Sequence, residues 1–376
     1  MPRILYLITE LDVGGAEKNL FRLAVALRDR GWDVEVAALS GRGEVGKWLA
    51  AEAIPVHYVG MDFKAGPLGF ARLVRVIRAA RPDILHTFLF HANVAGRLAS
   101  LFARAPIVVS SVRVAERRRR SHLFMDCLTQ SMVDVEVCVS EGVRQFTAAR
   151  AHISQRKLVV IANPVEKPVA SRPRLDVRRE LGASDADVVV LSVGRLDPQK
   201  GGLYLVAAAK ELLASRRALL FVVAGEGPQR PALEAAIAAA SIGEHFKLLG
   251  WRRDAADLYA AADIFVLPSL WEGMSNSLLE AAASGLACVA TSVEGSTEII
   301  DQGRTGLLVP PSDSRALSTA VASLIDDAPL RRRLGLEAAA KVAAEYSLER
   351  FVSAHAALYS RLLAGGGQCG DSSTAE

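Results

Sequence analysis

Short apolar runs alternate with amphipathic segments along most of the chain. Residues 3–8 form a continuous apolar run typical of a buried strand, residues 16–30 repeat apolar positions at helical spacing, and residues 33–39 are strand-like again. The pattern then predicts strands at 54–59, 83–87, 106–110 and 135–139, and helices at 67–80, 91–103, 121–133 and 141–150. Strands that alternate with helices form a parallel sheet covered on both faces.

The alternation stops at a proline-rich segment and then restarts. Residues 163–173 cannot continue a helix or a central strand, because prolines interrupt both, so this segment is the predicted linker. After it the pattern predicts strands at 187–193, 218–224, 263–267 and 287–291, and helices at 201–214, 229–240 and 276–284. Two doubly wound sheets are therefore expected, and such sheets bind ligands outside the carboxyl ends of their strands.

The length of 376 residues fits two domains. We expect an N-terminal domain over residues 1–167, a second domain over 168–345, a final helix over 346–364 that returns to the first domain, and a disordered tail over 365–376.

The composition favours a cytoplasmic protein. No apolar run reaches the roughly 18 residues that cross a bilayer, and the N-terminus lacks the pattern of a signal peptide. The cysteines have neither metal-ligand nor disulfide-framework spacing, as expected for free thiols in a reducing compartment; they are Cys127, Cys138, Cys288 and Cys369.

Charge is distributed unevenly along the chain. Residues 1–170 carry 24 Lys and Arg against 16 Asp and Glu, whereas the remainder carries 21 against 25. The basic half is therefore expected to meet an anionic partner. The densest cluster, Arg117 to Arg120, is foremost a solvated helix start and secondly a contact with anionic lipid headgroups. It lacks the interleaved aromatic residues of a nucleic-acid site, so no nucleic-acid partner is expected.

Two glycines stand between the first predicted strand and the first helix. Gly14 and Gly15 would let a phosphate or a sugar approach the amides of the helix N-terminus, although a simple tight turn is the alternative. They do not form the dinucleotide fingerprint, which needs three spaced glycines and an acid after the second strand.

Two other segments imitate known motifs. Residues 41–48 nearly spell a phosphate-binding P-loop, but Trp48 stands where a Ser or Thr must hold magnesium, so an ordinary surface loop is predicted. Asp185-Ala-Asp187 imitates a paired-aspartate metal motif. It precedes a strand instead of following one, so a polar turn is predicted.

Cations and a histidine follow other predicted strands. Arg195 and Lys200 flank a turn that enters a helix, which suits a diphosphate; a solvated basic loop is the alternative. His91 begins a helix at a strand end, where it can serve hydrogen bonding or acid–base chemistry or be merely structural. His86 lies on the strand itself and is treated as packing.

Two glutamates lie on either side of a predicted helix start. Ser277 and Glu280 fit a capping box, which would explain Glu280 without any ligand. Glu272 precedes that helix and follows a strand, so we expect it to point toward the crevice at the strand ends.

Taken in order, these and neighbouring segments resemble the family-4 retaining glycosyltransferases of the GT-B type, a fold of two Rossmann-like domains that face each other across a cleft. The resemblance spans almost the whole chain. The matching segments are Gly14-Gly-Ala-Glu17, His91 with Ala95-Gly-Arg-Leu-Ala99, Val139-Ser-Glu-Gly-Val143, Ile161-Ala-Asn-Pro164, Gly194-Arg-Leu196 with Lys200-Gly201, Ala224-Gly-Glu-Gly-Pro228, Pro268-Ser-Leu-Trp-Glu-Gly273, Leu279-Glu280-Ala281, and Glu298-Ile-Ile300 with Gly306-Leu-Leu-Val-Pro310.

The resemblance implies a role for each matching residue. Arg195 and Lys200 would bind the donor's diphosphate, so that no metal and no cofactor are required. Glu272 would face the donor sugar, and Glu280 would accept hydrogen bonds from the ribose. His91 would lie across the cleft near the reacting carbon. The other donor-binding residues implied are Gly14, Gly15, Gly273, Met274, Ser275 and Asn276.

The implied activity is transfer of a hexose-type sugar, with retention, from a nucleotide-diphosphate sugar to a sugar or lipid-linked acceptor. Many relatives carry Gly-Phe-Gly where this chain has Gly273-Met-Ser-Asn276, which leaves the donor sugar open. Two alternatives stay open at this point: a sugar-nucleotide epimerase of the same fold, and a non-enzymatic protein that binds anionic surfaces through Arg117 to Arg120. A peripheral contact of the basic domain with an anionic membrane is compatible with the first hypothesis.

Overall fold

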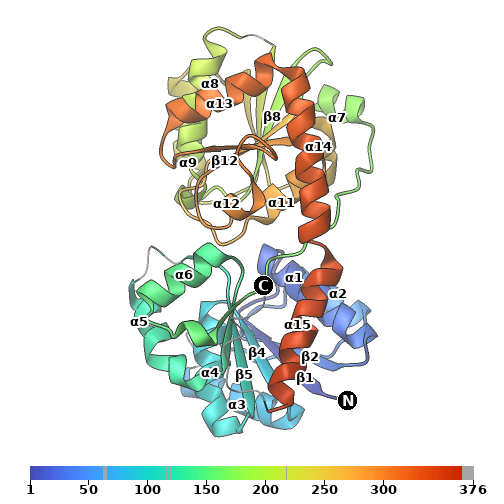
Figure 1. Ribbon diagram of the computed structural model, residues 1–376, viewed down its shortest axis with the longest axis vertical. Coiled ribbons are helices and arrows are strands. Elements are labelled where there is room, and N and C mark those ends of the chain that lie inside the picture. The colour runs from blue at the N-terminus through green and yellow to red at the C-terminus, as the bar shows by residue number, and fades with distance from the viewer. Residues whose placement is uncertain (62–65, 116, 118–119, 217, 366–376) are drawn as a thin grey trace, which may run out of the picture. The chain divides into compact units, whose positions relative to one another are not determined.

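The computed structural model describes residues 1–61, 66–115, 117, 120–216 and 218–365. The chain divides into two compact units (Figure 1). Unit 1 contains Met1–Pro164 together with the C-terminal segment from Leu348, and unit 2 contains Val165–Ser347. Each unit holds one parallel sheet flanked by helices, which confirms the predicted class of two doubly wound, Rossmann-like domains.

Unit 1 is built on a seven-stranded sheet with the order β3-β2-β1-β4-β5-β6-β7. Its strands are β1 (Arg3–Ile8), β2 (Asp33–Ala38), β3 (Val56–Tyr58), β4 (Ile84–Phe88), β5 (Ile107–Val112), β6 (Val135–Cys138) and β7 (Leu158–Val160). Its helices are α1 (Gly15–Asp29), α2 (Glu44–Ala51), α3 (Gly66–Ala80), α4 (Phe90–Ala103), α5 (Arg120–Thr129), α6 (Glu141–Arg150) and α15 (Leu348–Leu363). The strand order reverses between β1 and β4, so ligands are expected at the carboxyl ends of these two strands.

The C-terminal helix α15 completes the core of unit 1. Phe351, Leu358 and Tyr359 are buried in the same hydrophobic cluster as residues of β1 and α1. The hydroxyl of Tyr359 also lies 2.6 Å from His86 Nδ1, so a buried hydrogen bond joins α15 to β4.

Unit 2 is built on a six-stranded sheet with the order β10-β9-β8-β11-β12-β13. Its strands are β8 (Val188–Val193), β9 (Leu219–Ala224), β10 (Phe246–Gly250), β11 (Ile264–Leu267), β12 (Ala287–Thr291) and β13 (Leu307–Val309). Its helices are α7 (Arg174–Glu180), α8 (Gly202–Leu213), α9 (Arg230–Ala239), α10 (Ala255–Ala261), α11 (Asn276–Ala283), α12 (Ser296–Ile299), α13 (Ser314–Asp326) and α14 (Ala328–Glu345). Here the order reverses between β8 and β11.

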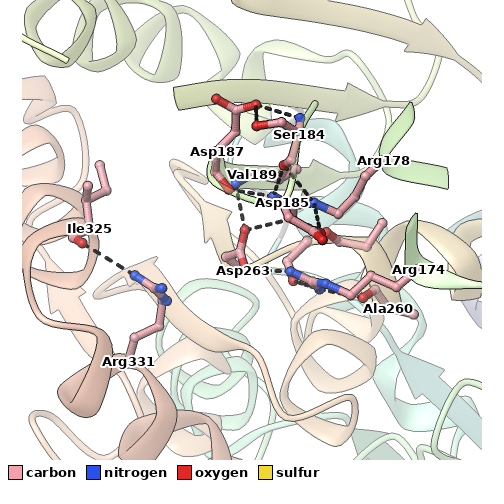
Figure 2. A network of polar contacts seen from close by, with 12 residues as sticks. Arg174, Arg178, Ser184, Asp185, Asp187, Val189, Ala260, Asp263, Ile325 and Arg331 are labelled. Atoms are coloured by element: carbon pink, nitrogen blue, oxygen red, sulfur yellow. Dashed lines mark hydrogen bonds and ion pairs between the residues drawn. The ribbon is translucent and has the colours of Figure 1, made fainter. Parts of the chain in front are cut away.

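A buried arginine holds the amino ends of β8 and β11 together. Figure 2 shows Arg178 of α7 reaching toward Asp263, which precedes β11; Nη1 donates to Asp263 Oδ2 at 3.0 Å. The same carboxylate oxygen accepts the amide of Val189 in β8 at 2.8 Å. The two strands on either side of the reversal are therefore joined at their amino ends through Asp263.

The segment Asp185-Ala-Asp187 forms the predicted polar turn (Figure 2). Asp187 Oδ2 accepts hydrogen bonds from the amide of Ser184 at 2.6 Å and from its hydroxyl at 2.7 Å. These bonds hold the pKa of Asp187 below its usual range. The carboxylate of Asp187 accepts hydrogen bonds inside the turn. This agrees with the prediction of a polar turn instead of a metal motif.

The prediction of a surface loop over residues 41–48 is wrong from Glu44 onward, because α2 begins there. Val45 and Leu49 are fully buried at helical spacing, and the ring of Trp48 packs edge-on against Phe21 with centroids 5.9 Å apart. An eight-residue helix gives too short a periodic pattern for detection by hydrophobic spacing. The helix is nevertheless anchored to α1, so this segment is part of the core.

Candidate active site

Two residues from separate loops meet at the carboxyl edge of the unit 2 sheet. Lys200 lies between β8 and α8, and Glu272 lies between β11 and α11. Because β8 and β11 are parallel neighbours, these loops leave the sheet side by side. The Lys200 Nζ atom donates to Glu272 Oε1 at 2.5 Å. The structure therefore brings together the residue predicted to bind the diphosphate, Lys200, and the residue predicted to face the sugar, Glu272.

Glu272 is held rigidly. Its side chain is buried, and the hydroxyl of Ser269 donates to Oε1 at 2.6 Å, to the same oxygen that Lys200 contacts. A buried carboxylate is stable only with such partners. Both of these bonds end on Oε1, so within the described residues Oε2 is left to accept from a ligand.

Arg195 has a different environment from Lys200. Its guanidinium extends into solvent with 67% of the side chain exposed, and Nη2 lies 3.5 Å from Asp197 Oδ2. Asp197 is itself buried and caps the short helical turn Pro198–Lys200 by accepting the amide of Gln199 at 2.9 Å. Asp197 thereby orients the loop that carries both cations.

A hollow opens beside this loop. Its polar lining comes from Ser192, Arg195, Asp197, Lys200 and Gln229, and its apolar lining includes residues of β8, β9, β10, β11, α8 and α9. The hollow therefore presents both cations of this loop near the carboxyl end of β8.

Gly201 allows the cation loop to approach β11. Its φ of +65° lies in the left-handed region, and a Cβ atom there would stand 1.9 Å from the carbonyl oxygen of Pro268. Any other residue would push the loop away from the strand end. The meeting of Lys200 with Glu272 therefore depends on a glycine at this position.

The segment after Glu272 starts α11. Ser275 is the N-cap, and its hydroxyl accepts the amide of Leu278 at 3.4 Å. The predicted capping box of Ser277 and Glu280 is wrong, because the helix begins two residues earlier and Glu280 Oε2 accepts from the hydroxyl of Tyr259 at 2.9 Å instead. The predicted donor-binding residues Gly273, Met274, Ser275 and Asn276 thus occupy the amino end of α11, where anions bind favourably.

In unit 1, Gly14 is the N-cap of α1 and Gly15 its first residue, at the end of the loop that follows β1. The carboxylate of Glu17 folds back over this helix start: a Cβ atom on Gly14 would stand 2.2 Å from Glu17 Oε2. Burial raises the pKa of Glu17. An acidic side chain of the protein itself thus lies where a phosphate was predicted to approach.

His91 is the second residue of α4 and is exposed. Its ring lies 5.3 Å from that of Phe90 and 5.9 Å from that of His122, both in edge contact. The preceding Leu89 has a φ of +73°, a conformation that costs a non-glycine residue energy and is common at functional sites. His91 therefore stands at the carboxyl end of β4, beside the reversal of strand order in unit 1.

His86 is a packing residue, as predicted. It is fully buried on β4 between Tyr359 and Ser111, whose hydroxyl lies 2.9 Å from Nε2. Burial lowers the pKa of His86 well below its usual value.

Several supporting residues escaped the sequence analysis. Ser269 and Tyr259 orient the two glutamates, and no local pattern marks them. Asp197 followed by Pro198 does carry the signature of a helical start and could have been found. Of the basic cluster, Arg118 and Arg119 lie outside the described residues. Among the described residues, no group of three or more His, Cys, Asp or Glu is arranged to hold a metal ion.

Two family models match the chain. The model described as Glycosyltransferase Family 4 matches residues 13–167, and the model described as Glycosyl transferases group 1 matches residues 187–327. The first covers the elements that carry Gly14 and His91, and the second covers those that carry Arg195, Lys200 and Glu272.

The alignments with similar proteins extend over most of the chain. The UDP-Gal:alpha-D-GlcNAc-diphosphoundecaprenol alpha-1,3-galactosyltransferase of Escherichia coli is 28% identical over 68% of this chain and 69% of its own. The phosphatidyl-myo-inositol mannosyltransferase of Mycolicibacterium smegmatis is 27% identical over 85% of this chain and 83% of its own. The crystal structure of Anabaena HepE in complex with UDP-glucose superposes with a TM-score of 0.85 at 22% identity, covering 95% of this chain and 99% of that protein, a likeness of fold.

Within the described residues, none of the helices combines the length and the apolar character that a membrane crossing requires.

Proposed function

Because the chain belongs to the GT-B glycosyltransferases, with a family 4 domain followed by a group 1 domain, we propose that it transfers a hexose-type sugar from a nucleotide-diphosphate sugar to an acceptor hydroxyl with retention of configuration. The observation that carries this proposal is the contact of Lys200 with Glu272 at the carboxyl ends of β8 and β11, next to Arg195. The matching families and relatives are glycosyltransferases, which argues against an epimerase and against a non-enzymatic binder as the main function.

In this proposal Lys200 and Arg195 stabilise the leaving group, which is the nucleotide diphosphate. When the bond between the anomeric carbon and the diphosphate breaks, negative charge accumulates on the phosphate oxygen. Lys200 and Arg195 stabilise this charge, a task that a metal ion performs in other enzymes, so we propose that no metal is required. Because Arg195 is extended and exposed before binding, it is free to close on the diphosphate as a two-point donor.

The carboxylates position the donor. Glu272 is fixed through Oε1 and offers Oε2 to hydroxyls of the sugar. Glu280 is oriented by Tyr259 and is proposed to accept from the ribose hydroxyls. The amino end of α11, from Gly273 to Asn276, adds backbone donors and a favourable helix dipole for the phosphate or sugar.

The chemical step needs no covalent intermediate with the protein. The acceptor oxygen bonds to the anomeric carbon on the face from which the diphosphate departs, and the acceptor proton passes to the departing phosphate oxygen. Gly14, Gly15 and His91 are the residues of unit 1 that we assign to the step, since they follow β1 and β4 at the reversal of strand order.

The acceptor is proposed to be a sugar or a lipid-linked sugar. Two relatives carry names that specify phosphate-bearing lipid acceptors, a diphosphoundecaprenol and a phosphatidyl-inositol. We also propose a peripheral contact of unit 1 with an anionic membrane. Exposed Phe124 and Leu128 stand four residues apart on α5, directly after the basic cluster. The cytoplasmic location and the absence of a nucleic-acid partner stay predictions.

A panel of UDP- and GDP-sugars tests this function. The full chain is incubated with each sugar nucleotide, with and without EDTA, and release of UDP or GDP by slow hydrolysis is measured. We expect one donor to be turned over at the same rate in both conditions. Failure to turn over or bind any donor would contradict the proposed transfer, and loss of turnover in EDTA would contradict its metal independence.

A further inference from the structure

Thr291 is a buried residue beside the loop that carries Glu272, and the proposed donor site does not use it. It is the last residue of β12, and 3% of it is exposed. Its Oγ1 donates a hydrogen bond to the backbone carbonyl oxygen of Ser269 at 2.5 Å. Ser269 is fully buried, and its own hydroxyl donates to Glu272 Oε1 at 2.6 Å. Two hydrogen bonds therefore lead from β12 through Ser269 to the carboxylate of Glu272.

The hydroxyl of Thr291 acts at the point where the backbone pairing of β11 with β12 stops. The last pair in that register is Leu267 with Ala290. The residue after Leu267 is Pro268, which has no N–H group and so cannot extend the pairing. The chain leaves the sheet there. The side-chain bond from Thr291 to Ser269 thus fixes the first part of a loop that the sheet itself no longer holds.

Thr291 is itself held in place by the sheet. Its backbone pairs with Val309 of β13, and the amide of the next residue, Ser292, donates to the Val309 carbonyl at 2.8 Å. A threonine side chain also has few rotamers, because two heavy atoms branch from its Cβ. The hydroxyl of Thr291 therefore has a defined position relative to the sheet.

The loop after β12 also touches the residues that follow Glu272. Gly295 has a φ of +73°, and a Cβ atom there would stand 2.2 Å from the carbonyl oxygen of Gly273 and 2.9 Å from Met274 Cα. Only glycine allows so close an approach. The chain from the end of β12 onward therefore supports the loop of Glu272 on both sides, with Thr291 before the glutamate and Gly295 after it.

A separate contact joins the same loop to the cation loop. The amide of Leu270 donates to the carbonyl of Gln199 at 2.7 Å, and Gln199 Nε2 donates to the Trp271 carbonyl at 2.9 Å. Gln199 directly precedes Lys200. These two bonds do not involve Thr291, so removal of its hydroxyl should leave the two loops in contact and the diphosphate ligands in place.

We propose that Thr291 is a positioning residue for sugar transfer: through Ser269 it sets the direction of the Glu272 carboxylate, and with it the place of Oε2 against the donor sugar. This inference rests on the proposed function, in which Glu272 faces that sugar. Because Thr291 is buried behind Ser269, it acts on the donor only through Glu272. A shift of a reacting or positioning group by about 1 Å can lower a rate about a hundredfold, so the loss of one such bond is expected to be measurable.

Thr291→Val tests the proposal, because it removes the hydroxyl and keeps the shape of the side chain. The assay uses the full chain and the donor that is turned over in the hydrolysis panel. The kcat should fall about tenfold, while the Kd for UDP or GDP, measured by calorimetry, should stay within about twofold. Thr291→Ala is a second variant without the hydroxyl and should give the same result. Thr291→Ser keeps the hydroxyl and should retain at least about half of kcat. An unchanged kcat without the hydroxyl, or an equal loss in Thr291→Ser, would overturn the proposal.

A double-mutant cycle with Glu272→Gln distinguishes positioning from general damage to the structure. If Thr291 acts through the carboxylate, Thr291→Val should lower the kcat that remains in Glu272→Gln by less than about twofold. An equal drop in both backgrounds would mean that Thr291 acts independently of Glu272, which is the opposite of what we propose.

Thr305→Val is the matched control. Thr305 is another buried threonine of unit 2, and its Oγ1 accepts the amide of Asp301 at 2.8 Å in the turn before β13. This substitution should lower the melting temperature to an extent similar to Thr291→Val and leave kcat unchanged; a similar loss of kcat in both would refute a specific role of Thr291. Failure of the proposed transfer would appear as no turnover by the unmodified chain, whereas failure of the positioning role would appear only in the variants.

Discussion

Lys200 and Glu272 are separated by 72 positions in the chain, yet their Nζ and Oε1 atoms lie 2.5 Å apart. The parallel pairing of β8 with β11 and the close approach at Gly201 produce this contact. A cation and a carboxylate thus stand side by side before any substrate binds. The following predictions depend on this arrangement and on its surroundings.

Glu272→Gln should lower kcat by about a hundredfold or more while nucleotide binding changes little, because the carboxylate is proposed to act on the sugar during transfer. Arg195→Ala should weaken binding of the nucleotide diphosphate by about 10- to 100-fold and lower turnover as well, since a charge-assisted hydrogen bond is lost. Steady-state kinetics and calorimetry with UDP or GDP measure both effects. An equal loss of nucleotide affinity in the two variants would refute this division of roles.

Gly201→Ala should destabilise unit 2 by more than about 3 kcal/mol, because a methyl group would collide with the Pro268 carbonyl in addition to straining the backbone. Gly285→Ala is the matched control. Gly285 also has a positive φ, of +81°, but a Cβ atom there meets nothing within 4 Å, so its cost should be near 1 kcal/mol. Urea unfolding compares the two, and similar losses would show that the close approach is unimportant.

The stability of unit 1 should fall when the pH drops below about 6.5. Burial lowers the pKa of His355 to about 4, so the folded chain keeps this imidazole neutral while the unfolded chain takes up a proton. Stability is then complete above pH 6.5 and decreases toward pH 4, by on the order of 3 kcal/mol for this residue. Burial also lowers the pKa of His86, so this residue adds to the loss of stability at low pH.

Thermal unfolding between pH 7 and pH 4.5 measures this dependence. The His355→Gln variant should lose less stability over that range than the unmodified chain, while the exposed control His152→Gln should follow the unmodified chain. Identical pH profiles for all three proteins would mean that His355 is not the group that titrates.

If unit 1 contacts an anionic membrane, the protein should sediment with vesicles of anionic lipid and not with vesicles of phosphatidylcholine alone. Phe124→Ser/Leu128→Ser should reduce the bound fraction several-fold, because both side chains are exposed on one face of α5. Leu336→Ser, which alters an exposed leucine of unit 2, serves as the control. Equal sedimentation of the three proteins would refute a contact through α5.

The fold class followed from the sequence because strands of a parallel sheet are buried on both faces and form continuous apolar runs. Such runs stand out at β1, β8 and β11. The sequence analysis missed α2, which has two turns, and β10, whose apolar pattern Lys247 interrupts. Hydrophobic spacing has too few positions in these two segments to identify them. It also missed the long helices α13 and α14.

The site was predictable only in part. Arg195, Lys200 and Glu272 were predicted because each lies in a loop that follows a strand. In a parallel sheet these loops lie at the same edge, where ligands bind. The roles of Ser269 and Tyr259 depend on side-chain directions, which no spacing along the chain encodes. The capping box at Ser277 failed because Ser275, two residues earlier, offered a competing cap.

A crystal structure of the chain with UDP or GDP bound tests the proposed donor site most directly. The diphosphate oxygens should lie about 3 Å from the Arg195 guanidinium and from Lys200 Nζ, with Glu272 facing the position of the sugar. A nucleotide bound with its diphosphate in contact with neither cation would contradict the proposed site.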